Sequence, residues 1–135
     1  MGVFDTKKLY VLDMDGTIYL GSRLFPETIP FLKRVKEHGK RYIFFTNNSS
    51  RSPETYVKRL NGMGIQASRE DIVTSGDVMI HFLKTHRPGK KVYLLGTPDL
   101  RRSFQEAGIP LTEEMPDIVL LGFDTTLTYE KLERA

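Results

Sequence analysis

The feature that most constrains the fold of this chain is a repeated alternation between short apolar runs and segments with helical periodicity. Apolar runs that end directly in polar residues or glycine are candidate strands, and they occupy residues 9–12, 42–45, 92–95 and 118–121. Between them, apolar residues recur every three or four positions, as at Ile29, Leu32 and Val35, which predicts helices. Unbroken apolar strands that alternate with helices are typical of a parallel sheet. The sequence therefore predicts an α/β fold.

Capping residues mark where several helices begin. Ser52-Pro53 and Thr97-Pro98 each combine an N-cap hydroxyl with a proline in the first turn, and Thr128 is placed to cap a last helix. A helix is also predicted from Asp77 to Thr85, after a very short strand at Ile72-Val73. The side chains expected to point inward from that helix are Val78, Met79, Phe82 and Leu83.

Composition limits the class of protein. The 135 residues include no Cys, which excludes disulfides and thiolate metal sites. No apolar run approaches the roughly 18 residues of a membrane helix, and no signal-peptide core is present, so we expect a cytoplasmic protein without membrane partners. The net charge is +3, and the Lys and Arg doublets are scattered. This pattern favours an ordinary solvated surface first, small anionic substrates second and nucleic acid a distant third.

A break at Pro88-Gly89 divides the chain into two expected parts. We expect residues 1–88 to form one part and residues 89–135 to begin another. The strand that begins at Val92 is predicted to lie in a separate unit rather than to extend the first sheet. The last helix stops at Ala135 without a C-cap, so we expect this chain to be a fragment of a longer protein.

Polar side chains follow the first two strands at the point where each strand ends. Asp13, Asp15 and Gly16 come after the first strand, and Thr46, Asn47 and Asn48 come after the second. Ligands of open α/β sheets bind beyond the carboxyl ends of the strands. We therefore expect the two polar groups to meet where the carboxyl ends of the strands lie. We also expect the strand before Asp13 to be a central strand of the sheet.

The two carboxylates have the spacing needed to divide the work of phosphoryl transfer. Just past a strand, alternate side chains point the same way, so Asp13 and Asp15 are expected to face one site. Asp13 could attack phosphorus as a nucleophile. Asp15 could act as general acid and then as general base. Two like charges this close favour a cation, and a site built from oxygen ligands suits Mg²⁺.

Neutral groups could complete such a site. Gly16 allows a tight turn whose N–H groups could face an anion. Thr46, Asn47 and Asn48 supply neutral donors for phosphoryl oxygens. Because phosphoryl transfer depends mostly on positioning and electrostatics, this set predicts a phosphoryl-binding site.

The Asp-x-Asp-Gly segment has two other interpretations. A surface turn is compatible with its residues. A calcium loop of the EF-hand type requires Gly in mid-loop and Glu at the end, where this chain has Ile18 and Leu24. Calcium is therefore excluded. The strand before Asp13 and the Thr-Asn-Asn segment after the next strand favour the active-site interpretation over the turn.

These motifs also resemble those of a known family. Residues 9–20, LYVLDMDGTIYL, resemble motif I of the haloacid dehalogenase superfamily, and residues 44–50, FFTNNSS, resemble motif II as found in its NagD-like subfamily IIA, the 4-nitrophenyl phosphatase type. Residues 117–135 are similar to the start of that subfamily's inserted cap. The resemblance runs through the whole chain. It implies an incomplete Rossmann-like core with motifs I and II in residues 1–88, followed by the first part of an α/β cap of the C2 type in residues 89–135.

The resemblance also implies roles for individual residues. Asp13 would be the phosphorylated nucleophile and Asp15 the acid and base, with Mg²⁺ on the Asp13 carboxylate and the Asp15 backbone carbonyl. Thr46 and Asn47 would bind the phosphoryl group, with Asn48 adjacent. The substrates implied are small organophosphates such as sugar phosphates, nucleotides or 4-nitrophenyl phosphate.

One departure from the family is large. Family members also need a motif III lysine and a motif IV acidic cluster, both after the cap, and neither Glu113-Glu114 nor Asp124 replaces them. We therefore expect the full-length protein to be a Mg²⁺-dependent phosphomonoester hydrolase that forms an aspartyl-phosphate. The alternative is that this chain is a truncated, weakly active or inactive module that binds phosphate or Mg²⁺. A phosphotransferase and a homo-oligomer both stay open.

Overall fold

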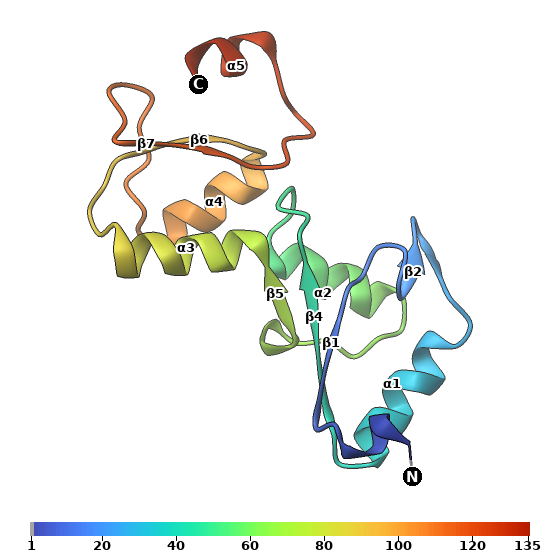
Figure 1. Cartoon of the computed structure of the whole chain (residues 1–135). Helices are drawn as coiled ribbons and strands as arrows, with labels where there is room; N and C mark the ends of the chain where they lie inside the picture. Colours follow the sequence, from blue (N-terminus) through green and yellow to red (C-terminus); the bar gives the residue numbers. More distant parts are fainter. Residues whose placement is uncertain (1) are drawn as a thin grey trace. The chain divides into compact units, whose positions relative to one another are not determined.

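The computed structural model describes residues 2–135, and these form two compact units joined by the chain (Figure 1). Within the described residues, the first unit comprises the chain up to Thr46 and residues 53–73. The second unit comprises residues 47–52 and 74–135. Strands and helices alternate in both units, which confirms the predicted α/β class.

The first unit is built on a three-stranded sheet with the strand order β1-β4-β5. Its strands are β1 (Leu9–Leu12), β4 (Arg41–Thr46) and β5 (Ile72–Thr74), and a small antiparallel pair is formed by β2 (Tyr19–Leu20) and β3 (Arg23–Leu24). Its helices are α1 (Thr28–Glu37) and α2 (Pro53–Gly62), with short 3₁₀ turns at Val3–Thr6 and Arg69–Asp71. β1 and β4 run parallel, with Leu9 opposite Arg41 and Leu12 opposite Phe44.

The core of the first unit gathers around β4. Phe44 is fully buried, and Tyr42 packs against it with ring centroids 5.3 Å apart. Leu32 and Val35 of α1 and Leu60 of α2 are buried in the same cluster. The apolar spacing that predicted these helices is thus the spacing of their buried faces, except that Ile29 is 43% exposed.

The position of β1 differs from our expectation. We expected the Asp13 strand at the centre of its sheet, but within the described residues β1 lies at the sheet edge and β4 is central. Its alternate side chains are accordingly open to solvent, with Leu9 50% and Val11 59% exposed. The apolar run identified a strand, but apolar character alone could not show how many neighbours that strand has.

The second unit contains a separate parallel pair of strands. These are β6 (Val92–Leu95) and β7 (Ile118–Leu121), accompanied by α3 (Ser75–His86), α4 (Pro98–Glu106) and α5 (Tyr129–Arg134). In Figure 1, α4 lies on one side of this pair and α5 on the other, which agrees with the burial of every residue of β6. The Val92 strand therefore pairs with β7 and does not extend the first sheet, as expected. Helix α3 precedes Pro88 but is counted with this unit; the division between core and cap at residue 88 stays a prediction.

The buried face of α3 differs from the predicted one. Leu83 is buried with Met79 and Ile80 against the α4 cluster, but Val78 is 50% and Phe82 41% exposed. Helix α3 packs against α4 and β6, and this packing buries the face of α3 that carries Met79 and Leu83. Phe82 instead stacks on the ring of His86 at 4.9 Å.

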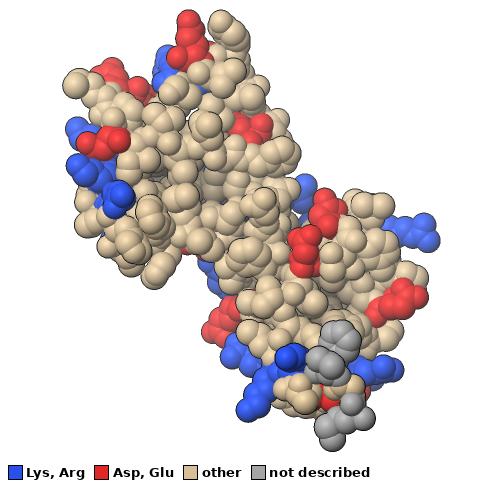
Figure 2. Space-filling model, viewed as in Figure 1, with Lys and Arg blue, Asp and Glu red and all other residues tan. Residues whose placement is uncertain are grey.

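Two surface properties were also predicted from the sequence. Among the described residues, no helix combines the length and the apolar character needed to cross a membrane. Figure 2 shows Lys and Arg interspersed with Asp and Glu on the visible face, in agreement with the scattered basic doublets.

A partly buried ion pair holds α5 within the second unit. The Asp124 side chain is 1% exposed, and Lys131 Nζ donates to its Oδ2 at 2.9 Å. Thr126 donates to the same carboxylate through its N–H at 2.8 Å and its hydroxyl at 2.6 Å. Tyr93 of β6 donates its hydroxyl to the Lys131 carbonyl at 2.9 Å. Burial acts to raise the pKa of Asp124, but the hydrogen bonds from Lys131 and Thr126 outweigh it, and the pKa lies below its ordinary value.

This pair predicts a specific pH dependence of stability. A carboxyl whose pKa is lowered on folding stabilises the folded chain above its unfolded pKa of about 3.9, and that stabilisation is lost as the pH falls through the folded pKa. We expect Asp124→Asn to lower the free energy of unfolding at pH 7 by about 1–3 kcal/mol. It should also flatten the fall of stability below about pH 4.

Urea unfolding between pH 3 and 7 measures both effects. Glu130→Gln is the matched control, because Glu130 pairs with Arg134 in an exposed ion pair that contributes little. An Asp124→Asn curve that runs parallel to that of the unsubstituted chain at all pH values would contradict the assignment.

Candidate active site

The register between β1 and β4 sets the geometry of the candidate site. Leu12 ends β1 opposite Phe44, and β4 continues two residues further to end at Thr46. Asp13 follows β1 directly, and Thr46 is buried at 4% exposure. The carboxyl ends of two adjacent parallel strands therefore bring the Asp13 segment and Thr46 to the same edge of the sheet, as expected.

A tight turn separates the two aspartates. Met14 between them is fully buried, and its carbonyl accepts hydrogen bonds from the N–H groups of Thr17 at 3.1 Å and Ile18 at 3.0 Å. Burial of Met14 anchors the turn in the core and leaves Asp13 and Asp15 exposed on either side of it. The Asp13 carboxylate also accepts from the N–H of Met14 at 2.8 Å.

Gly16 serves this turn through its backbone conformation. Its φ of 80° lies in the left-handed region, which glycine adopts without a steric penalty. Its N–H donates to the Tyr19 carbonyl at 2.7 Å. The predicted contribution of Gly16 to phosphate binding therefore depends on the shape of the turn rather than on its own N–H.

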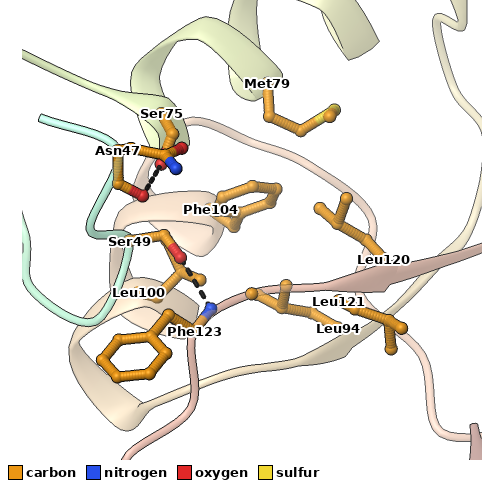
Figure 3. Close-up of a pocket in the computed structure, with 12 residues that line it drawn as sticks. Asn47, Ser49, Ser75, Met79, Leu94, Leu100, Phe104, Leu120, Leu121 and Phe123 are labelled. Atoms are coloured by element: carbon orange, nitrogen blue, oxygen red, sulfur yellow. Dashed lines mark hydrogen bonds between the residues drawn. The ribbon is translucent and has the colours of Figure 1, made fainter.

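The segment after Thr46 passes into the second unit. Asn47 is exposed, and its backbone carbonyl accepts a hydrogen bond from the Ser75 hydroxyl at 3.0 Å (Figure 3). The Asn48 side-chain oxygen accepts from the N–H of Ser50 at 2.9 Å, which closes a local turn. The Asn48 side chain thus shapes this loop. Its predicted position next to the phosphoryl group stays a prediction that follows from its place beside Asn47 in the chain.

An apolar cavity of about 310 Å³ adjoins Asn47 within the second unit. Asn47, Ser49 and Ser75 form its polar side, as Figure 3 shows. Its remaining side chains are apolar: Met79, Leu94, Leu100, Phe104, Leu120, Leu121 and Phe123. The volume is at the lower end of the range of small-molecule sites, so this cavity could hold a small uncharged group.

The carboxylates at the end of β1 carry oxygen atoms of the kind that Mg²⁺ prefers as ligands. Within residues 2–135, no three His, Cys, Asp or Glu side chains are gathered closely enough to hold a metal ion. Mg²⁺ usually keeps several waters and uses one or two carboxylates together with substrate phosphate. Asp13 and Asp15 supply two carboxylates, both exposed to solvent.

Several residues that shape the loop after Thr46 were not recognised in the sequence. Besides Ser75, these are Thr97 and Asp99, which join the loop to the rest of the second unit by hydrogen bonds. Ser49, which lies within the second motif, accepts a further bond from the Phe123 N–H. Thr97 was identified only as an N-cap, a role that it has through the N–H of Leu100. Nothing in the local sequence pattern indicates the hydrogen bond that Thr97 donates to the Ser50 carbonyl.

Comparisons with known proteins identify the family of this chain. Residues 10–110 match the family described as haloacid dehalogenase-like hydrolase. An acid sugar phosphatase of Staphylococcus saprophyticus is 35% identical over 129 residues, which cover 95% of this chain and 50% of that protein. The chain spans about half the length of the curated relatives it matches.

Solved structures give the same result. The crystal structure of a 4-nitrophenylphosphatase from Thermotoga maritima is similar with a TM-score of 0.93 and 45% identity, over 99% of this chain and 51% of that one. A glycerol phosphate phosphatase from Mycobacterium tuberculosis, crystallised in complex with magnesium, has a TM-score of 0.79 and 29% identity, over 93% of this chain and 39% of that one. The family resemblance of the two motifs is confirmed: this chain belongs to the haloacid dehalogenase-like hydrolases.

Proposed function

We propose that the complete protein that carries this chain is a Mg²⁺-dependent phosphomonoester hydrolase that acts through an aspartyl-phosphate intermediate. The observation that carries the proposal is the position of Asp13, Asp15 and Thr46 at the ends of two adjacent parallel strands. Family membership supports it, since the similar proteins named above are phosphatases.

The proposed reaction has two steps. In the first, a carboxylate oxygen of Asp13 bonds to phosphorus as the ester oxygen leaves, and Asp15 gives that oxygen a proton. In the second, Asp15 takes a proton from water as the water oxygen bonds to phosphorus. The bond between phosphorus and Asp13 then breaks, which restores the Asp13 carboxylate and releases inorganic phosphate.

Neutral donors and a cation hold the phosphoryl group in this proposal. The Thr46 hydroxyl and Asn47, the next residue along the chain, donate hydrogen bonds to phosphoryl oxygens, and Asn48 and Gly16 shape the segments around them. The Asp13 carboxylate and the Asp15 backbone carbonyl would hold Mg²⁺, which neutralises negative charge when bound. The magnesium complex of the similar glycerol phosphate phosphatase supports this choice of ion.

The substrates we propose are small organophosphates. Sugar phosphates and 4-nitrophenyl phosphate are suggested by the names of similar proteins, and nucleotides belong to the same chemical class. A phosphotransferase would use the same first step with an acceptor other than water. Release of inorganic phosphate in the absence of any acceptor distinguishes the hydrolase.

Substitution of the two aspartates tests the mechanism. With the complete protein and 4-nitrophenyl phosphate in Mg²⁺, we expect Asp13→Asn to lower kcat at least about 1,000-fold, because an amide is a poor nucleophile. Asp15→Asn should lower kcat about 100- to 10,000-fold and let phosphorylated enzyme accumulate, since 4-nitrophenolate leaves without much protonation. EDTA should abolish turnover.

The control for these substitutions is Glu70→Gln, which makes the same change from carboxylate to amide at an exposed position of a 3₁₀ turn. Its kcat should equal that of the unsubstituted protein. Undiminished release of 4-nitrophenolate by Asp13→Asn would overturn the proposed function.

A second candidate function concerns the 135 residues by themselves. They span about half the length of the curated relatives that they match. As an isolated polypeptide this chain would be a phosphate- or Mg²⁺-binding module with little or no activity.

A comparison of the two polypeptides decides between these functions. We expect the isolated chain to hydrolyse 4-nitrophenyl phosphate at least about 100-fold more slowly than the complete protein, because removal of charge-stabilising groups has effects of that size. Initial rates at equal molar concentration measure the ratio. Equal rates would show that the 135 residues contain all the groups the reaction requires.

A further inference from the structure

We propose that Thr97 and Asp99, at the start of α4, are positioning residues for the phosphate-binding loop, defined here as residues 47–52. The inference rests on the proposed function, because it assigns these two residues a role in holding phosphoryl-binding groups. Neither residue belongs to the two motifs that indicated the site.

The contacts of the loop carry this inference. Thr97 donates its hydroxyl to the Ser50 carbonyl at 2.8 Å, and Asp99 Oδ2 accepts the N–H of Ser52 at 2.7 Å. The loop is therefore tied to the first turn of α4 through its backbone at two places. Two further bonds join it to other elements: Ser75 donates to the Asn47 carbonyl at 3.0 Å, and the Phe123 N–H donates to Ser49 Oγ at 2.8 Å (Figure 3).

The bond from Thr97 is buried, and the bond to Asp99 is partly buried. Ser52 and Thr97 are each 4% exposed, Ser50 is 8% exposed, and the Asp99 side chain is 21% exposed. A buried backbone group that loses its partner keeps the full cost of desolvation, so either bond, once removed, favours a different loop conformation. The loop conformation therefore depends on the side chains at positions 97 and 99.

The start of α4 is closely packed. Leu100, 4% exposed, lies against three glycines, and an added Cβ at Gly76, Gly96 or Gly122 would come within 3.0 Å, 2.9 Å or 2.7 Å of its side chain. A Cβ at Gly122 would also lie 3.3 Å from Ser49 Oγ. The glycines allow α4, the end of β7 and the loop to approach closely, so the loop lies against a densely packed part of the second unit.

The position of the loop in the chain connects this support to the reaction. Asn47 follows Thr46 directly, so a displaced loop moves donors for phosphoryl oxygens but leaves Asp13 and Asp15 on their own strand. Weaker anchoring should therefore reduce affinity for the phosphoryl group more than the rate of the chemical step. In kinetic terms, KM and the inhibition constant of inorganic phosphate should rise more than kcat falls.

Two pairs of variants of the complete protein test the inference, with 4-nitrophenyl phosphate as substrate and inorganic phosphate as competitive inhibitor. Thr97→Val removes the hydroxyl, and Thr97→Ser retains it. Asp99→Ala removes the acceptor for Ser52, and Asp99→Asn retains one. Far-UV circular dichroism and the Tm establish that each variant is folded at the assay temperature.

Matched controls separate positioning from general stability. Thr128 is also an N-cap, since its hydroxyl accepts from the N–H of Lys131 at 3.3 Å, but it makes no hydrogen bond to the loop, so Thr128→Val removes a cap alone. Asp99 also pairs with Arg102, and Arg102→Gln removes that ion pair while the bond to Ser52 remains.

We expect Thr97→Val and Asp99→Ala each to raise the inhibition constant of phosphate about three- to tenfold, the effect of one net hydrogen bond. Thr97→Ser, Asp99→Asn, Thr128→Val and Arg102→Gln should stay within about twofold of the unsubstituted protein. Thr97→Val with the same inhibition constant as Thr128→Val, or a lower kcat with an unchanged inhibition constant, would overturn the inference. If Thr97→Val does not fold, the comparison of Asp99→Ala with Arg102→Gln decides by the same criteria.

The outcome is separable from that of the proposed function. Undiminished turnover by Asp13→Asn would reject the hydrolase mechanism whatever the Thr97 and Asp99 variants do. Full loss of activity in Asp13→Asn, together with unchanged phosphate inhibition in Thr97→Val and Asp99→Ala, would keep the mechanism and reject only the positioning role.

Discussion

The parallel pairing of β1 with β4 is the constraint on which the candidate site depends. The core fixes this pairing, because Tyr42 and Phe44 of β4 are buried on one face of the sheet. Residues Leu9 to Leu12 of β1 pair with β4 in a single register. A slip of one residue would turn Phe44 away from the core. The parallel pairing and its register therefore place Asp13 and Thr46 at the same end of neighbouring strands. A carboxylate and a hydroxyl in these positions can contact one ligand.

The chain passes from the first compact unit to the second within the segment that we propose to bind phosphate. Thr46 is the last residue counted with the first unit, and residues 47–52 are counted with the second before the chain returns at Pro53. Hydrogen bonds explain this division, since the loop is bonded to α3, α4 and the end of β7. The conformation of residues 47–52 is thus set by contacts inside the second unit.

Sequence patterns predicted what depends on neighbouring residues and failed where distant contacts decide. The strand at residues 92–95 and the cap at Thr97 follow from local residue types, and both are present. The predicted inward position of Val78 was wrong because the buried face of α3 is selected by packing against α4. The bond between Ser52 and Asp99 joins residues 47 positions apart, and nothing in either local sequence indicates it.

The residue type at position 97 shows how the loop restricts a local choice. As an N-cap, aspartate serves a helix at least as well as threonine, because both accept a hydrogen bond from the first turn. Thr97, however, accepts from the N–H of Leu100 and also donates to the Ser50 carbonyl, and an ionised carboxylate has no proton to donate. Aspartate at this position would bring a negative charge against a carbonyl oxygen in a buried place. The hydroxyl of serine or threonine meets both demands from a single atom, and aspartate does not.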